Sequence, residues 1–140
     1  MVRIITDYGA LLLYAMGQTL LLALLGLFFA CVLGLLFGLM NVVKNRPCNI
    51  IATLFVDVIR GVPMIVLAYF IYFGIPYLWN TILAIGGMNL TALQAGTICL
   101  ALNCGAYMAE IIRAGIQSVD KGQMEAARSL GLPYWKSMQK

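Results

Sequence analysis

The sequence predicts an all-α membrane protein, and its composition and two long uncharged intervals lead to that prediction. Hydrophobic residues make up 63% of the chain and charged residues 10%, whereas soluble domains contain roughly a half and a quarter of each. Residues 8–43 and 61–109 contain no charged side chain, which gives intervals of 36 and 49 residues. Because a transmembrane helix needs about 20 apolar residues, we expect one span in the first interval and two in the second.

The first span is expected at about residues 18–40, with residues 8–17 at the membrane interface. The uncharged interval far exceeds the apolar core of a signal peptide, about 7–15 residues, so we expect no cleavable signal. Within this span a small residue recurs at every fourth position, at Gly26, Ala30, Gly34 and Gly38. Such a seam lets a neighbouring helix approach closely. The alternative is that these residues only reflect the general frequency of glycine in membrane helices.

The second and third spans are expected at about residues 62–79 and 91–109, joined by a turn-rich connection around Gly86, Gly87 and Asn89. Asp57 and Arg60 lie three residues apart, just before the second span. A charge at the centre of a lone helix costs roughly 2.5–3.5 kcal/mol, so we expect both at the interface, paired with each other. A longer span that begins near Ile50, with this pair buried in a helix bundle, is the alternative.

The distribution of basic residues predicts the orientation. Eight of the nine basic residues fall on one side of the predicted spans: Lys44, Arg46, Arg60, Arg113, Lys121, Arg128, Lys136 and Lys140. Cytoplasmic segments of membrane proteins carry such an excess of Lys and Arg. The N-terminus and the loop at 80–90 are therefore expected outside, and the segment after the third span inside.

Several classes of function are disfavoured by the residue types present. The chain has no histidine, and its cysteines at positions 31, 48, 99 and 104 show no CxxC spacing, so we expect no zinc site and no metal. Without histidine, Ser/His/Asp catalysis is excluded, and we expect no bound cofactor. The basic residues form no patch interleaved with aromatic residues, so nucleic acid is not an expected partner.

Residues 118–133, SVDKGQMEAARSLGLP, predict a short polar helix after the last span. Asp120 is the expected N-cap, with Gln123 three residues later as a side-chain variant of the capping box. Gly131 is expected to end the helix in a left-handed conformation, and Pro133 prevents its continuation.

A helix of about ten residues is marginal in water by itself, so this one is expected to contact a partner. Ala126 and Ala127 offer a low-profile face that fits a groove. The segment has no large apolar face, so a protein partner is favoured over a position on the lipid surface.

Polar residues within the spans have two interpretations. Asn103, Tyr107 and Glu110 share one helical face, at spacings of four and three residues. Polar groups in membrane segments usually face a bundle interior or a water-filled path. These residues are therefore expected either to line a translocation path or to make hydrogen bonds between helices, and the same ambiguity applies to Asp57 and Arg60.

Several motifs carry a resemblance to a known family. Glu125-Ala126-Ala127, followed after three residues by Gly131, resembles the EAA loop of bacterial ABC importer permeases. RGVP at 60–63, YFGIP at 72–76 and AYMAEIIRAGIQSVDKGQMEAARSLGL at 106–132 resemble the permeases for polar amino acids of the histidine, glutamine and arginine kind. The resemblance covers most of the chain from Gln18 onward, and the last block is its most specific part.

The resemblance implies a mechanism for the tail. In that family the EAA loop is a coupling helix that docks into a cleft of a cytoplasmic ATPase subunit and transmits its closure to the membrane path. It implies that Gly122, Glu125, Ala126, Ala127 and Gly131 contact the ATPase: Glu125 makes a polar contact, the alanines fit closely, and Gly131 makes the bend. The chain itself is not expected to hydrolyse ATP.

The resemblance also implies partners: two ATPase subunits, a second permease copy or paralogue, and an extracytoplasmic binding protein, all at the bacterial cytoplasmic membrane. Such permeases usually have five spans. We therefore expect these 140 residues to be one partial permease domain, a piece of a longer chain that lacks the C-terminal spans. The alternatives are a permease for another small solute, or a small structural membrane protein whose tail recruits a partner.

Overall fold

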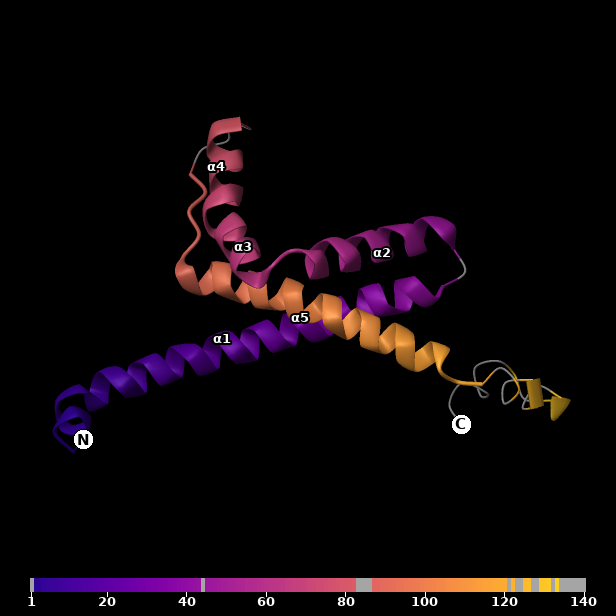
Figure 1. Cartoon of the computed structure of the whole chain (residues 1–140), viewed down its shortest axis with the longest axis horizontal. Coiled ribbons are helices and arrows are strands. Elements are labelled where there is room, and N and C mark those ends of the chain that lie inside the picture. The colour runs from indigo at the N-terminus through magenta and orange to yellow at the C-terminus, as the bar shows by residue number, and fades with distance from the viewer. Residues whose placement is uncertain are drawn as a thin grey trace.

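A computed structural model describes residues 2–43, 45–82, 87–120, 122, 125–126, 129–131 and 133, with side chains from Tyr8 onward. The predicted positions Lys44, Gly86, Lys121, Gln123, Ala127, Arg128, Lys136 and Lys140 lie outside these residues. The described chain folds into helices α1 (Val2–Val42), α2 (Arg46–Gly61), α3 (Met64–Tyr69), η1 (Phe70–Gly74), α4 (Ile75–Tyr77), η2 (Leu78–Ile82) and α5 (Ala92–Gln117) (Figure 1). The predicted all-α fold class is confirmed.

Within the described residues, three helical segments are long and apolar enough to cross a membrane: Tyr8–Val42, Met64–Ile82 and Ala92–Gln117. They overlap the three predicted spans and extend beyond them at several ends. Many of their large apolar side chains are exposed; Leu13, for example, is 71% exposed and Ile111 70%. Such a surface is unfavourable in water and suits contact with lipid tails.

α1 and α5 lie side by side and run in the same direction (Figure 1). The glycine seam of α1 faces α5: Cβ atoms built on Gly26 and Gly38 would stand 3.0 Å from side-chain atoms of Leu100 and Ile112. Ala30, between them in the seam, is fully buried. Because glycine has no side chain, the two helices can approach to backbone contact here.

α2 lies between the first and second predicted spans and belongs to neither of them. The helix runs back along the end of α1 (Figure 1), where Phe55 stacks on Phe37 with 3.9 Å between ring centroids. Ala52 and Val56 are buried, while Leu54 is 63% exposed. A helix with one face on the protein and apolar residues on another satisfies its backbone hydrogen bonds internally, as a segment next to lipid requires.

The helical conformation is interrupted between α2 and α3. Val62 and Pro63 are extended, with ψ angles of 128° and 134°. Proline disfavours helical conformation in the residue before it and cannot donate a backbone hydrogen bond. Figure 1 shows the ribbon turning away from α1 and α5 at this point.

Residues 64–82 form one continuous helical rod with two π-helical stretches, η1 and η2. The backbone N–H of Ile75 donates to the carbonyl of Phe70, five residues earlier. Pro76 follows directly, and its missing N–H removes a helical hydrogen bond, so the local widening to a π turn accompanies the proline.

Polar side chains fix the start of α5 and the segment that leads into it. Thr91 caps the helix: the Gln94 backbone N–H donates to Thr91 Oγ1 at 3.3 Å, and the Thr91 N–H donates to Gln94 Oε1 at 3.0 Å. This reciprocal pair is a capping box. Asn80 ties the end of η2 to the next stretch, because its side chain both donates to and accepts from the backbone of Met88.

A small apolar core joins α3 and η1 to α5. It consists of Leu67, Ile71, Ala95 and Cys99. The Cys99 thiol also donates to the carbonyl of Met64 at 3.7 Å. This core holds the rod beside the first turns of α5, on the far side of the Pro63 break from α2.

Candidate functional site

A cluster of charged side chains lies between α2 and α5. On α5, Arg113 holds Glu110 in a bidentate pair: its Nε donates to Oε2 at 3.1 Å and its Nη2 donates to Oε1 at 2.5 Å. Arg60, from α2, lies on the other side of the same carboxylate, with 4.0 Å between its Nη1 and Oε2. The Glu110 side chain is 29% exposed, so its carboxylate is only partly accessible to solvent.

Tyr107 adds an aromatic contact to this cluster. The Arg60 guanidinium carbon lies 5.1 Å from the centre of the Tyr107 ring, within the range at which an arginine is attracted to an aromatic face. Arg60 is therefore placed by two residues of α5, one turn apart. Arg113 also donates to the side chain of Gln117 at 3.5 Å, so the polar contacts extend to the last residue of α5.

The expected ion pair between Asp57 and Arg60 is wrong, because the ion-pair partner of Arg60 in the described structure is Glu110. The interfacial position of Arg60 stays a prediction. Arg60 lies fourteen residues from the start of α2, or about 21 Å along the helix axis at 1.5 Å per residue, and its side chain is 37% exposed.

Polar residues follow one side of α2. Arg46, Asn49, Thr53, Asp57 and Arg60 are spaced by three or four residues, which puts them on one helical face. Asn49 and Thr53 use this face to bind α1, since Asn49 Nδ2 donates to the Asn41 carbonyl at 2.8 Å and Thr53 Oγ1 donates to Asn41 Oδ1 at 2.9 Å.

On α5 the polar face contains Asn103, Tyr107, Glu110 and Gln117. Asn103 is half-buried one turn before Tyr107, which is 48% exposed. The structure therefore brings four of the five predicted residues to a common region at which α2 meets α5, namely Asp57, Arg60, Tyr107 and Glu110, with Asn103 one turn away on the same helix. Polar groups arranged in this way can offer hydrogen-bond partners to a polar solute among apolar helices, and they can also hold two helices together.

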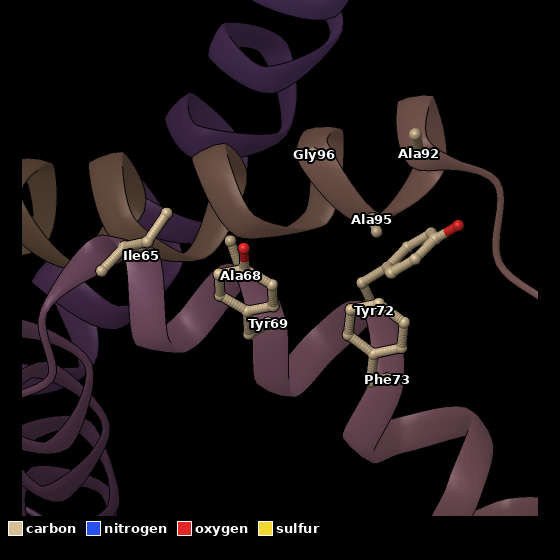
Figure 2. Close-up of a pocket in the computed structure, with 8 residues that line it drawn as sticks. All are labelled: Ile65, Ala68, Tyr69, Tyr72, Phe73, Ala92, Ala95 and Gly96. Atoms are coloured by element: carbon tan, nitrogen blue, oxygen red, sulfur yellow. The ribbon is translucent and has the colours of Figure 1, made fainter.

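A separate apolar groove of about 250 Å³ lies between the rod and the start of α5. Figure 2 shows its lining, which comes from both elements: Ile65, Ala68, Tyr69, Tyr72, Phe73, Ala92, Ala95 and Gly96. Its lining offers few polar groups apart from the two tyrosine hydroxyls, so it does not resemble a site for a charged solute.

The tail begins directly from α5. The Ser118 backbone N–H donates to the Ala114 carbonyl at 2.9 Å. Asp120 then accepts a hydrogen bond from the Gly122 N–H through Oδ1 at 3.0 Å, which is the geometry of a helix N-cap. The helical residues described beyond it include Glu125 and Ala126, both exposed.

Gly131 has a φ angle of +80°, the left-handed conformation that commonly ends helices. One residue earlier, the Leu130 N–H donates to the Ala126 carbonyl at 3.2 Å. The described part of the tail thus has a capped start and a left-handed end. Its exposed residues leave Glu125 and Ala126 available to a partner.

Comparison with known proteins identifies the family. A sequence model of the family described as "Binding-protein-dependent transport system inner membrane component" matches residues 30–140. The chain belongs to this family. As a member of the family, it is similar to the probable amino-acid ABC transporter permease protein YckA of Bacillus subtilis (strain 168), with 41% identity over 87% of this chain and 50% of YckA.

Two further comparisons agree. The probable glutamine ABC transporter permease protein GlnM of the same organism is 37% identical over 98% of this chain and 60% of its own length. A solved structure described as "Crystal structure of an amino acid ABC transporter with histidines" matches with a TM-score of 0.81 and 40% identity, over 96% of this chain and 59% of that chain. This family member therefore spans about half to three fifths of the length of these relatives.

Three residues outside the predicted site also take part in these contacts. Arg113 orients Glu110, and its spacing of three from Glu110 is a sequence signal for a helical ion pair. Asn41 and Thr53 hold α2 against α1, and this contact has no signature within one helix.

Proposed function

We propose that the chain forms the membrane subunit, or part of it, of an ATP-driven importer that carries polar amino acids into the cell. The main support is the 40% identity and TM-score of 0.81 to a crystal structure described as an amino acid ABC transporter. The relatives named as amino-acid and glutamine permeases support the same solute class. ATP would be hydrolysed by separate ATPase subunits and not by this chain.

The tail would receive the movement of the ATPase. Gly122, Glu125, Ala126, Ala127 and Gly131 are the proposed contacts. The capped start at Asp120 and the left-handed φ of Gly131 support a short rigid helix, and a rigid element transmits displacement that a frayed one would absorb. Exposed Glu125 and Ala126 are free to enter a groove on the partner.

The polar region between α2 and α5 is the proposed side of the chain that faces the translocation path. Asp57, Arg60, Asn103, Tyr107 and Glu110 would line it. Its support is chemical: ionisable groups among apolar membrane helices usually face a water-filled path or a bundle interior. The apolar groove beside the rod offers no comparable set of charges.

The proposed setting is the bacterial cytoplasmic membrane, with the N-terminus outside and the tail in the cytoplasm. The excess of basic residues after α5 and in the α1–α2 turn supports this orientation. The partners would be two ATPase subunits, a second permease copy or paralogue, and an extracytoplasmic binding protein that delivers the amino acid.

Reconstitution tests this function. The transporter would be assembled in vesicles with its ATPase subunits and binding protein, and uptake of radiolabelled glutamine, arginine and histidine would be measured with and without ATP. We expect ATP-dependent uptake of at least one of the three. Uptake of a different class of solute, with none of these amino acids carried, would contradict the proposed substrate class.

A further inference from the structure

We propose that Glu110 is a positioning residue that holds α2 against α5 just before the Val62–Pro63 break, so that the two helices move as one unit with the tail. The proposal rests on the proposed function and deepens it, because it assigns the cluster a role in transmitting movement. Its starting point is that one carboxylate serves arginines from two helices.

The two arginines hold Glu110 differently. Arg113 lies on the same helix and makes both hydrogen bonds, so it fixes the direction of the carboxylate. Arg60, from α2, lies with its Nη1 4.0 Å from Oε2 of this oriented carboxylate, and its guanidinium group lies over the Tyr107 ring. Arg113 thus orients the carboxylate, and Arg60 is the group through which α2 is held.

Arg60 lies where such a link has the most effect. It is one residue before the end of α2 at Gly61, and Val62 and Pro63 follow in extended conformation. A Cβ built on Gly61 would meet no atom within 4 Å, so packing does not restrain the chain there. When α2 is held at Arg60, bending is confined to residues 61–63.

The other end of α2 is held independently. Asn41 of α1 accepts hydrogen bonds from Asn49 and Thr53, and Phe37 stacks on Phe55. α1 is in turn packed on α5 through its glycines. Helices α1, α2 and α5 are therefore joined at several points, whereas the rod of residues 64–82 is joined to α5 mainly by the apolar core around Leu67 and Ile71.

This arrangement gives the tail a route to the membrane region. α5 continues without interruption from Glu110 to Gln117 and leads directly into Ser118. A displacement of the tail would shift α5, and through Glu110 and Arg60 it would shift α2. The rod is attached to this unit through the Pro63 break and through the apolar core on α5, so bending at residues 61–63 would change how the rod lies against the unit and would alter the width of the apolar groove between the rod and α5 (Figure 2).

The test measures ATP hydrolysed per amino acid imported by the assembled transporter in vesicles. Glu110→Gln, Arg60→Gln and the double variant are compared with the wild type. If the residues act through one link, each single variant raises the ratio by about fivefold or more, a size typical of coupling between sites, and the double variant is no worse than either single variant. Multiplied losses in the double variant, or an unchanged ratio in the single variants, would overturn the proposal.

Arg46→Gln is the matched control, because it makes the same substitution as Arg60→Gln at the opposite end of α2, where Arg46 is exposed and forms no ion pair among the described residues. We expect its ratio to stay near that of the wild type. A change confined to the KM for the amino acid in Glu110→Gln would also overturn the proposal, since it would mean that Glu110 acts by contacting the solute.

A second measurement does not depend on transport. In a chain that keeps Arg60 and Glu110 but whose native cysteines are replaced, Asp57→Cys, one turn before Arg60, and Ala114→Cys, one turn after Glu110, would be joined by a short bis-maleimide reagent, with and without ATP. The link predicts equal crosslinking yields in both conditions, because α2 and α5 stay together. A yield that falls with ATP would overturn it. Absence of uptake by the wild-type assembly would contradict the proposed function alone, since the crosslinking yield still tests the link.

Discussion

Gly34 of α1 lies so close to Met108 of α5 that a Cβ atom built on Gly34 would stand 2.5 Å from the Met108 Cβ. The same atom would lie 3.2 Å from the carbonyl oxygen of Gly105. These neighbours are a backbone group and the root of a side chain, so they cannot rotate away. The distance between α1 and α5 therefore depends on the absence of a side chain at position 34.

Gly34→Ala is expected to push α1 and α5 apart and to lower the free energy of unfolding by about 1–3 kcal/mol, the usual range for overpacking. Thermal unfolding of the purified chain in detergent measures this. Gly17→Ala is the matched control, because no atom lies within 4 Å of its added Cβ, and alanine favours helix over glycine by about 1 kcal/mol. Equal stability of the two variants would contradict the close α1–α5 packing.

Thr53→Val is expected to loosen α2 from α1. The substitution keeps the side-chain shape but removes the hydrogen bond to Asn41 Oδ1, and Asn41 is only 6% exposed. We expect a loss of about 1 kcal/mol, typical of a hydrogen bond removed from a sheltered acceptor. Thr19→Val is the control, since among the described residues the Thr19 hydroxyl donates to Ala15 of its own helix and to no other helix. A loss no larger than that of the control would count against this contact.

Part of this fold is readable from the sequence because it depends on local patterns. The uncharged intervals predicted the apolar helices, and the spacing of Gly26, Gly34 and Gly38 predicted a face for close packing. The partner helix was not predictable, because the match of Gly26 with Leu100 joins residues far apart in the chain. α2 does not follow from the search for uncharged intervals because it carries charged residues, although buried Ala52 and Val56 and polar Asn49, Thr53 and Asp57 recur with a helical period.

The same limit applies to the site. The spacing of Tyr107 and Glu110 predicted a shared face, since this follows from the period of one helix. The partner of Arg60 was assigned to the nearest acidic residue, Asp57, but the fold supplies Glu110, fifty positions later. The capping box of Thr91 and Gln94 was a local signal that sequence reasoning overlooked.

Gly131→Leu is expected to leave membrane insertion intact but to uncouple ATP hydrolysis from uptake in the assembled transporter. The φ angle of +80° at Gly131 disfavours a leucine, which would shift the end of the tail helix. Gly131→Asn is the control, because asparagine tolerates this conformation. Uptake and ATP hydrolysis are measured together in vesicles. Normal coupling in the leucine variant would contradict the role of this bend.

The most direct test of the account asks whether the tail touches an ATPase subunit in the assembled transporter. A photo-crosslinking amino acid would replace Ala126, which is exposed. In a control it would replace Leu13, an exposed residue in the first third of α1. The account predicts a crosslink to the ATPase from position 126 and none from position 13. An assembled, ATP-hydrolysing transporter with no crosslink from position 126 would contradict it.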